Sequence, residues 1–442
     1  YIFAAMRINN HYKSISFLLI LLSITSFFIG FFYGENSAGA GTLYHDFNNV
    51  WKNLQTFQNN DLGTAINFTA GSDREIFQSS RTPLIYILHK IFNPFTGNKI
   101  SFINSVFVIS LSVPILFYLS LKQKFKNEDN LLLILISSTV CLSPFFRTSS
   151  YWGLEENYSI ITLLLTFIFL NQFLSNNNSL WKNYYQIFLV SLFSSLCLYF
   201  DQKLAIIPLI CFFCIFFSNK SIKLKILLFL FYFIFSLPYI YLITIWGNII
   251  PSGDATGRSI GNELHLSHIG YAATIIAFYL LPFLLYKKNG FSDQIKNFFK
   301  EKKNYYLIFL FFIYLSYLLI FYDYDSEVKL GKGFVHKISI LIFKKSFFRE
   351  IFIYFAFFIS WIIILIYSEN NLKDKLIIFY FFSISVIVWP IFQEYFDPLI
   401  ILMAFTFLNS KLFLNYRGSI LFFLYLSILL ISSNIYYYNL LN

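Results

Sequence analysis

Long apolar runs recur along almost the whole chain, and they constrain the fold more than any other feature of the sequence. A helix needs about 20 residues to cross a hydrocarbon core of ~30 Å, and backbone groups in lipid must bond within the chain. The runs show none of the alternation that strands need, and only 12% of the residues are charged. The sequence therefore predicts an all-α fold, a polytopic transmembrane helical bundle.

Counting the runs predicts about thirteen spans in a single integral membrane domain, residues 1–442. The predicted spans are residues 15–33, 101–121, 130–146, 157–174, 184–199, 204–218, 224–246, 268–286, 305–322, 350–368, 374–391, 396–410 and 417–437. The first run has a second interpretation, a signal peptide, because Arg7 and Lys13 precede it. The apolar core of a signal peptide is usually about 7–15 residues long, so we expect a retained span.

Basic residues set the expected orientation. If the N-terminus is cytoplasmic, most of the 33 Lys and Arg fall in inside segments, as the positive-inside rule requires. Their place in short loops also argues against nucleic-acid binding as the reason for the net charge of +11. Three long segments then lie outside, at residues 34–100, 247–267 and 323–349. We expect the functional site on that face.

Two apolar stretches in these outer segments are too short to span, Pro83–Phe92 and Phe334–Phe343. Such stretches are typical of interfacial or re-entrant helices. The alternative for residues 334–343 is a true span, favoured by the basic residues that follow it. That alternative would reverse the sidedness of every later segment.

The acid that follows the first span is Asp46, in the polar stretch Tyr44–Phe47 of the first outer segment. A carboxylate at the membrane surface can accept a proton from a sugar hydroxyl and turn the hydroxyl into a nucleophile. Asp46 is therefore the predicted catalytic base. The alternatives are an ordinary loop acid or a helix cap.

A second acidic site lies in the short connection before predicted span 157–174. Glu155 and Glu156 can position an acceptor sugar, or bind a divalent cation such as Mg²⁺ or Mn²⁺ through oxygen ligands. The alternative is an ion pair in which Arg147 bonds a glutamate of the same connection and closes the loop.

Basic and polar residues in later segments can hold a phosphate. A Gly-rich stretch contains Asp254, Arg258 and His265, and backbone N–H groups, a guanidinium and an imidazole can surround one phosphate. Lys332 and His336 are candidates for the same role, or snorkelling side chains at the membrane surface. Further candidates in tight connections between spans are Arg147, Lys203, Glu394 and Asp397.

In their order along the chain these features resemble the GT-C class of membrane glycosyltransferases, which use polyprenyl-phosphate sugars. The order is a first span, an acidic outer loop, a short helix with Arg81-Thr82-Pro83-Leu84-Ile85-Tyr86, and a further bundle with a second acidic outer loop. Within the class, the chain is similar to the dolichyl-phosphate-glucose-dependent α-1,2-glucosyltransferases. The resemblance implies a GT-C-like fold with its active site on the outer face.

Four motifs carry the likeness to that family. Asp46 falls at the place of the family's acid after the first span, although Phe47 stands where the family has a second acid. Gly253-Asp254 with Arg258 and His265 is similar to the family's Gly-Asp-Arg-Ser-Ser-His-Glu stretch. The other two are Lys332-Gly333-Phe334-Val335-His336, similar to Asn-Arg-His-Tyr, and Glu394-Tyr395-Phe396-Asp397-Pro398, similar to Glu-Phe-Arg-Tyr-Tyr but without its Arg.

The predicted function is the transfer of one sugar, with inversion, from a polyprenyl-phosphate donor to a lipid-linked or surface glycan acceptor. Expected partners are this donor, the acceptor and membrane lipids, without nucleic acid, in a bacterial inner membrane with the site facing the periplasm. The alternatives are a transporter or flippase, a polymerase or ligase of lipid-linked envelope polysaccharide, or a non-catalytic scaffold. The predicted roles are Asp46 as base, Glu155 and Glu156 on acceptor or metal, and Arg258, His265, Lys332 and His336 on the donor phosphate.

Overall fold

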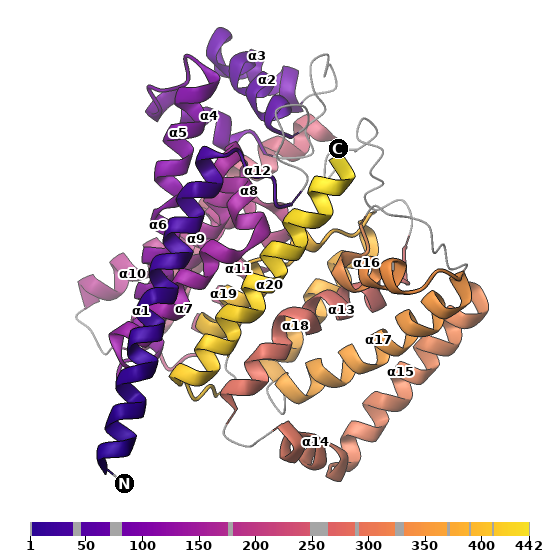
Figure 1. Cartoon of the computed structure of the whole chain (residues 1–442). Coiled ribbons are helices and arrows are strands. Elements are labelled where there is room, and N and C mark those ends of the chain that lie inside the picture. Colours follow the sequence, from indigo (N-terminus) through magenta and orange to yellow (C-terminus); the bar gives the residue numbers. More distant parts are fainter. Residues whose placement is uncertain are drawn as a thin grey trace. The chain divides into compact units, whose positions relative to one another are not determined.

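The computed structural model describes residues 2–38, 46–70, 82–175, 180–247, 264–287, 291–322, 331–368, 372–388, 390–408 and 411–441. Within those residues every regular element is a helix, and no strand is present (Figure 1). The all-α class predicted from the apolar runs is therefore confirmed.

The chain forms two compact units, one of Tyr1–Gly257 with Phe423–Asn442 and one of Arg258–Phe422. The single membrane domain stays a prediction. The first unit contains α1 (Ile2–Phe32), α2 (Asp46–Asn59), α3 (Leu62–Ala70), α4 (Leu84–Phe92), α5 (Lys99–Ser110), α6 (Ser112–Lys124), α7 (Asn130–Ser138), η1 (Thr139–Leu142), α8 (Pro144–Trp152), α9 (Glu156–Ser175), α10 (Leu180–Phe200), η2 (Gln202–Leu204), α11 (Ile206–Phe216) and α12 (Ile222–Trp246).

The second unit contains α13 (His268–Leu280), η4 (Leu281–Tyr286), α14 (Phe291–Lys300), α15 (Lys302–Phe321), α16 (Gly333–Ile342), α17 (Ser346–Ser368), α18 (Leu372–Ile387), η5 (Gln393–Tyr395) and α19 (Leu399–Thr406). The last helix, α20 (Tyr416–Leu441), begins in the second unit and continues into the first.

Eight helices in the described residues are long and apolar enough to cross a membrane. They coincide with eight of the thirteen predicted spans: Asn10–Phe32, Lys99–Lys124, Glu156–Ser175, Ile222–Trp246, His268–Tyr286, Asn304–Phe321, Ser346–Ser368 and Tyr416–Tyr438. A ninth, over predicted span 130–146, is broken by a 68° bend between Asn130–Leu142 and Pro144–Trp152. The structure thus supports eight spans, or nine with the bent pair, and the count of thirteen is not confirmed.

The other four predicted spans correspond to helices that miss this description. α10 has 21 residues, α11 belongs to a short apolar stretch Gln202–Phe216, and α18 and α19 have 16 and 8 residues. α10 is followed by α11, and α18 by α19. If both members of a pair cross the membrane, or if neither does, later segments stay on the same side. The bent helix has no such companion, and the expected sidedness therefore depends on it.

Apolar faces left exposed by packing support a membrane setting. In α12 and α15, only 11% and 17% of the most apolar window is buried. The side chains exposed there include Phe233, Leu310 and Leu319. Soluble proteins rarely leave contiguous apolar surface of this extent to water. Together with the helix lengths, these faces indicate a multi-pass membrane protein.

The two short apolar stretches expected in the outer segments are both helical, as α4 and α16. They have 9 and 10 residues. At ~1.5 Å per residue neither helix reaches across ~30 Å of hydrocarbon. Helix length therefore gives no support to the alternative in which residues 334–343 form a complete span.

Amphipathic packing places the outer helices of the first unit. Apolar residues of α2 recur every three or four positions, and Phe47, Leu54 and Phe57 are fully buried. This face packs in one core with Tyr86 of α4 and Phe102 of α5. As a result α2, α3 and α4 gather at one end of the unit, away from the N-terminus of α1 (Figure 1). The start of α2, and with it Asp46, is held by this packing.

Candidate functional site

Asp46 is the first residue of α2 and is partly exposed. The ring of Phe47 lies 6.3 Å from that of Trp152, centroid to centroid, so the start of α2 lies beside the end of α8. A carboxylate in the first turn of a helix also interacts favourably with the helix dipole. Both predictions, a catalytic base and a helix-terminal acid, are compatible with this position.

Glu155 is almost fully buried, at 2% exposure, in the turn between α8 and α9. The Tyr86 hydroxyl donates a hydrogen bond of 2.7 Å to Glu155 Oε1, and Asn53 Nδ2 donates to the same hydroxyl oxygen at 3.3 Å. Burying a carboxylate is costly unless it is hydrogen-bonded. Two side-chain hydrogen bonds, from Asn53 to Tyr86 and from Tyr86 to Glu155, therefore link α2, α4 and the start of α9.

A left-handed glycine creates this turn. Gly153 has φ +65° and ends α8, and a Cβ atom there would lie 2.9 Å from Phe102 Cε1. Glycine adopts this conformation without the steric cost that other residues meet. The chain reverses here and delivers Glu155 to the N-terminus of α9, where a negative charge is favoured.

Beside it, Glu156 is half-buried and Asn157 is fully buried. In the described part of the chain, neither Nδ2 nor Oδ1 of Asn157 has a hydrogen-bond partner. Buried amides without partners are rare because desolvation is then not compensated. Asn157 is a polar residue of this turn that the sequence patterns did not single out.

Arg147 does not bond Glu155 or Glu156 in the way the loop-closing alternative expected. Its Nε and Nη2 donate to Glu35 Oε2 at 3.1 and 2.6 Å, and the side chain is 2% exposed. Nη1 donates to Ser26 Oγ and to Cys141 O, and Nη2 also donates to Ser26 O. A guanidinium has five N–H donors, so all are used inside the protein. This geometry favours a structural role for Arg147.

Lys203 lies in the turn before α11, where its Nζ is 3.2 Å from Asp201 Oδ2. Asp201 also caps η2, because its Oδ1 accepts a hydrogen bond from the Lys203 backbone N–H at 3.0 Å. Lys203 therefore lies in a tight connection between helices, as predicted, and its contacts with Asp201 are those of an ordinary turn.

In the second unit, predicted phosphate-binding residues gather around Tyr271. Lys332 Nζ lies 5.5 Å from the centre of the Tyr271 ring, and the buried His336 ring meets the same ring edge-on at 5.8 Å. One turn earlier on α13, the His268 imidazole stacks on that of His265 at 5.0 Å. The structure therefore brings Lys332, His336 and His265 into one basic cluster.

The backbone at Lys332 is unusual. Gly331, Lys332 and Gly333 have φ values of +74°, +60° and +77°. A non-glycine residue in the left-handed region costs about 1–2 kcal/mol, and such strain tends to collect at functional sites. The Lys332 N–H donates to Ile391 O at 2.7 Å and holds the turn in place. The turn aims the lysine across Tyr271.

The acidic candidates of the second unit are Glu394 and Asp397, and Glu394 lies near α16, the helix that carries His336. Burial lowers the pKa of Lys337 on α16 to about 8, and the neighbouring Glu394 carboxylate partly offsets the shift. Gln393 accepts from the Phe334 N–H at 2.8 Å and donates to the Tyr279 hydroxyl at 2.8 Å, which joins η5 to α16 and α13. Asp397 is buried at 4% exposure.

Two predicted residues, Asp254 and Arg258, lie outside the described residues. Among the residues that the structure describes, no group of three or more His, Cys, Asp or Glu side chains is arranged to hold a metal ion. The divalent cation expected at Glu155 and Glu156 stays a prediction.

Comparison with protein-family models, curated proteins and solved structures gives no match to this chain. The likeness to the GT-C class therefore rests on the sequence motifs alone.

Proposed function

We propose that this protein is a GT-C-like membrane glycosyltransferase that transfers one sugar from a polyprenyl-phosphate donor to a lipid-linked or surface glycan acceptor. The observation that carries the proposal is the basic cluster around Tyr271, in a unit built from apolar helices. A lysine set on a left-handed turn beside three imidazoles suits a phosphate at the membrane surface. The proposed location is a bacterial inner membrane with the site facing the periplasm.

In the proposed reaction, Asp46 takes the proton from an acceptor hydroxyl. The hydroxyl oxygen forms a bond to the anomeric carbon while the bond from that carbon to the phosphate oxygen breaks, with inversion. The electron pair of the broken bond leaves with the lipid phosphate. Lys332 offsets the charge that grows on this leaving group, an interaction stronger in the transition state than in the ground state. Arg258 would add a second cation.

Glu155 and Glu156 are proposed to position the acceptor. Glu155 is held by Tyr86 at 2.7 Å, and a carboxylate fixed in this way can accept a hydrogen bond from a sugar hydroxyl without reorganising. Alternatively, Glu155 and Glu156 would bind a divalent cation, whose further oxygen ligands would come from substrate or water.

One observation favours a second candidate, a transporter or flippase for lipid-linked glycans. The helix Asn130–Leu142 and its continuation Pro144–Trp152 meet at 68°. Broken helices of this kind form substrate sites in many transporters. The two functions make opposite predictions for a purified protein, because a transporter moves the lipid-linked glycan without changing it.

The test is sugar transfer by the purified protein in proteoliposomes, with a panel of radiolabelled polyprenyl-phosphate sugars and membrane lipid extract. Asp46→Asn should lower transfer by about 10²–10⁴-fold, the usual contribution of a general base. The matched control is Asp61→Asn, because Asp61 Oδ1 accepts the Thr64 N–H at 3.0 Å as a helix cap and Asn caps equally well.

Equal transfer by wild type and Asp46→Asn would remove Asp46 as the base. Flux of labelled lipid-linked glycan across the vesicle membrane without any transfer would assign the transporter function instead.

A further inference from the structure

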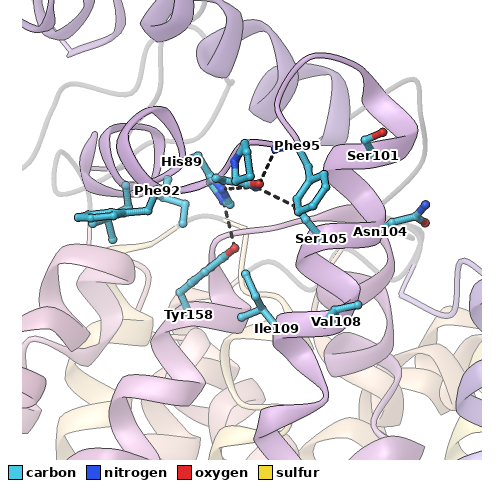
Figure 2. A pocket seen from close by; sticks show the side chains of 13 residues that line it. His89, Phe92, Phe95, Ser101, Asn104, Ser105, Val108, Ile109 and Tyr158 are labelled. Atoms are coloured by element: carbon cyan, nitrogen blue, oxygen red, sulfur yellow. Dashed lines mark hydrogen bonds between the residues drawn. The ribbon is translucent and has the colours of Figure 1, made fainter.

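A groove of about 780 Å³ lies in the first unit between α4, α5 and the start of α9 (Figure 2). Small-molecule sites usually have volumes of about 300–1,000 Å³. The groove walls come from Leu88 and Phe92 of α4, Phe95 of the following loop, and Val108 and Ile109 of α5. The volume and apolar walls suit a ligand with hydrocarbon chains.

Helical spacing separates this groove from the Glu155 network. Ile85, Leu88, His89 and Phe92 line the groove, and their spacing puts them on one face of α4. Tyr86 bonds Glu155, and Lys90 Nζ donates to the Phe57 carbonyl in the last turn of α2 and to the Asn60 carbonyl just after it. Tyr86 and Lys90 thus form a second row on α4, next to the row that lines the groove.

His89 makes two hydrogen bonds in the wall of the groove (Figure 2). Asn93 Oδ1 accepts from the Phe95 N–H at 2.9 Å, so its Nδ2 is the donor toward His89 Nδ1, also at 2.9 Å. His89 Nδ1 is then an acceptor, and Nε2 carries the proton that it donates to the Tyr158 hydroxyl oxygen at 3.0 Å. The hydrogen of that hydroxyl is left to donate elsewhere.

None of the described side chains that line the groove is ionised. Burial lowers the pKa of His89 to about 4, which keeps the imidazole neutral at physiological pH. None of the other residues that line the groove is acidic or basic. The nearest lysines along the chain are engaged on the α2 side, Lys90 as above and Lys99 with Asn48 Oδ1 at 3.4 Å. An anionic head group would therefore find no cation among the described residues that line the groove.

The groove opens along a membrane-crossing helix. Ser101, Asn104, Ser105, Val108 and Ile109 all belong to the candidate span Lys99–Lys124. Val108 is 64% exposed and Phe92 is 74% exposed. In a bilayer these side chains face lipid, so a lipid can reach the groove laterally.

We propose that this groove binds a neutral glycerolipid of the diacylglycerol type, with its acyl chains along Phe92, Val108 and Ile109 and its glycerol head toward Tyr158. Tyr158 can donate to an ester carbonyl, and Ser101, Asn104 and Ser105 line the same groove with neutral polar groups. A diacylglycerol head offers one hydroxyl and two ester carbonyls, whereas an isoprenoid alcohol offers one hydroxyl only. The site is separate from the proposed donor site, because a polyprenyl phosphate needs a cation.

The experiment uses the full-length protein in nanodiscs with a photoreactive diacylglycerol that carries a diazirine on one acyl chain. Labelled peptides are identified by mass spectrometry, and competition by unlabelled diacylglycerol, phosphatidic acid and a single-chain isoprenoid alcohol is measured. Labelling should fall within residues 85–109 and be displaced by diacylglycerol at least tenfold more effectively than by the other two lipids.

Two variants test the geometry. Tyr158→Phe keeps the ring but removes both the hydrogen bond to the lipid and the acceptor of His89 Nε2. We expect affinity for the lipid to fall about five- to tenfold through loss of the first of these bonds. Ile109→Trp fills the groove and should abolish specific labelling, whereas the control Ile115→Trp, at a 60% exposed position of the same span that does not line the groove, should not.

Displacement by phosphatidic acid as effective as that by diacylglycerol would overturn the neutral-head selectivity. Stronger displacement by the isoprenoid alcohol would overturn the glycerolipid assignment, and labelling unchanged by Ile109→Trp would overturn the site itself. None of these outcomes depends on sugar transfer, so they are distinct from failure of the proposed function.

Discussion

Removing the charge of Glu35 should destabilise the first unit strongly, because Arg147 would then be buried without a counter-ion. Glu35→Gln keeps the shape and one acceptor oxygen, so the change isolates the charge. Breaking a buried ion pair by removing one partner usually costs about 3–5 kcal/mol. The Glu35 side chain is 15% exposed, against 2% for Arg147, so water can reach part of the pair. We therefore expect the lower end, about 3 kcal/mol.

Arg147→Met should cost a similar amount, because it strands the Ser26 and Cys141 carbonyl oxygens that Arg147 now bonds. The double variant Glu35→Gln with Arg147→Met should cost about 2 kcal/mol less than the sum of the single changes, since neither buried charge then remains. Such coupling is the signature of a direct interaction.

The assay is equilibrium unfolding of the purified protein in mixed detergent and lipid micelles. The matched control is Lys13→Met, which breaks an exposed pair with Asp129 at 2.8 Å, in which the two side chains are 41% and 37% exposed. Exposed pairs contribute about 0–1 kcal/mol. If Glu35→Gln costs no more than Lys13→Met, or if the two single changes add without coupling, the argument that Arg147 serves structure is refuted.

Three further changes probe the second unit. Lys332→Ala should raise KM for the polyprenyl-phosphate donor about 10–100-fold through loss of a charged hydrogen bond, with Lys332→Arg retaining most activity, as measured by steady-state transfer. Gly333→Ala should destabilise the unit in thermal unfolding, because φ is +77° and the new Cβ would lie 2.5 Å from Ile275 Cγ1, whereas Gly97→Ala, with no heavy atom within 4 Å, should be neutral. Burial lowers the pKa of Lys337 from 10.5 to about 8. The unfolded chain then binds the proton more tightly, so stability should rise between about pH 8 and 10.5, and Lys337→Met should remove that rise in a pH series of unfolding curves.

Helix content and the main spans could be predicted from the sequence because both follow from local properties. An apolar run long enough to cross the bilayer has few alternatives to a helix. Three of the four predicted spans without such a helix are runs in which the helix is short, such as α19 with 8 residues. Hydropathy measures how apolar a run is, whereas the length of a helix also depends on the turns that end it.

The partner of Arg147 could not be predicted, because Glu35 is 112 positions away in the chain. Glu155 is the nearer acid in sequence and has the right charge. The left-handed turn at Gly153 sends the chain back before Glu155, so the two side chains belong to different networks. Gly30 allows the distant pairing, because a Cβ there would lie 2.2 Å from Glu35 Oε2 and 2.5 Å from Arg147 Nη2.

Helix α4 contributes both to the hydrogen bonds around Glu155 and to the groove at Tyr158. Tyr86 bonds Glu155 and His89 bonds Tyr158, and in both cases the partners are 69 positions apart. The two bonds therefore lie about one helical turn apart, both along α4 and between Glu155, just before α9, and Tyr158 in its first turn. A shift of α4 that changed one bond would strain the other, because both helices are rigid over a single turn. A lipid bound at Tyr158, as proposed, would therefore contact the same two chain segments that hold the Glu155 carboxylate, although these segments are 69 positions apart in the sequence.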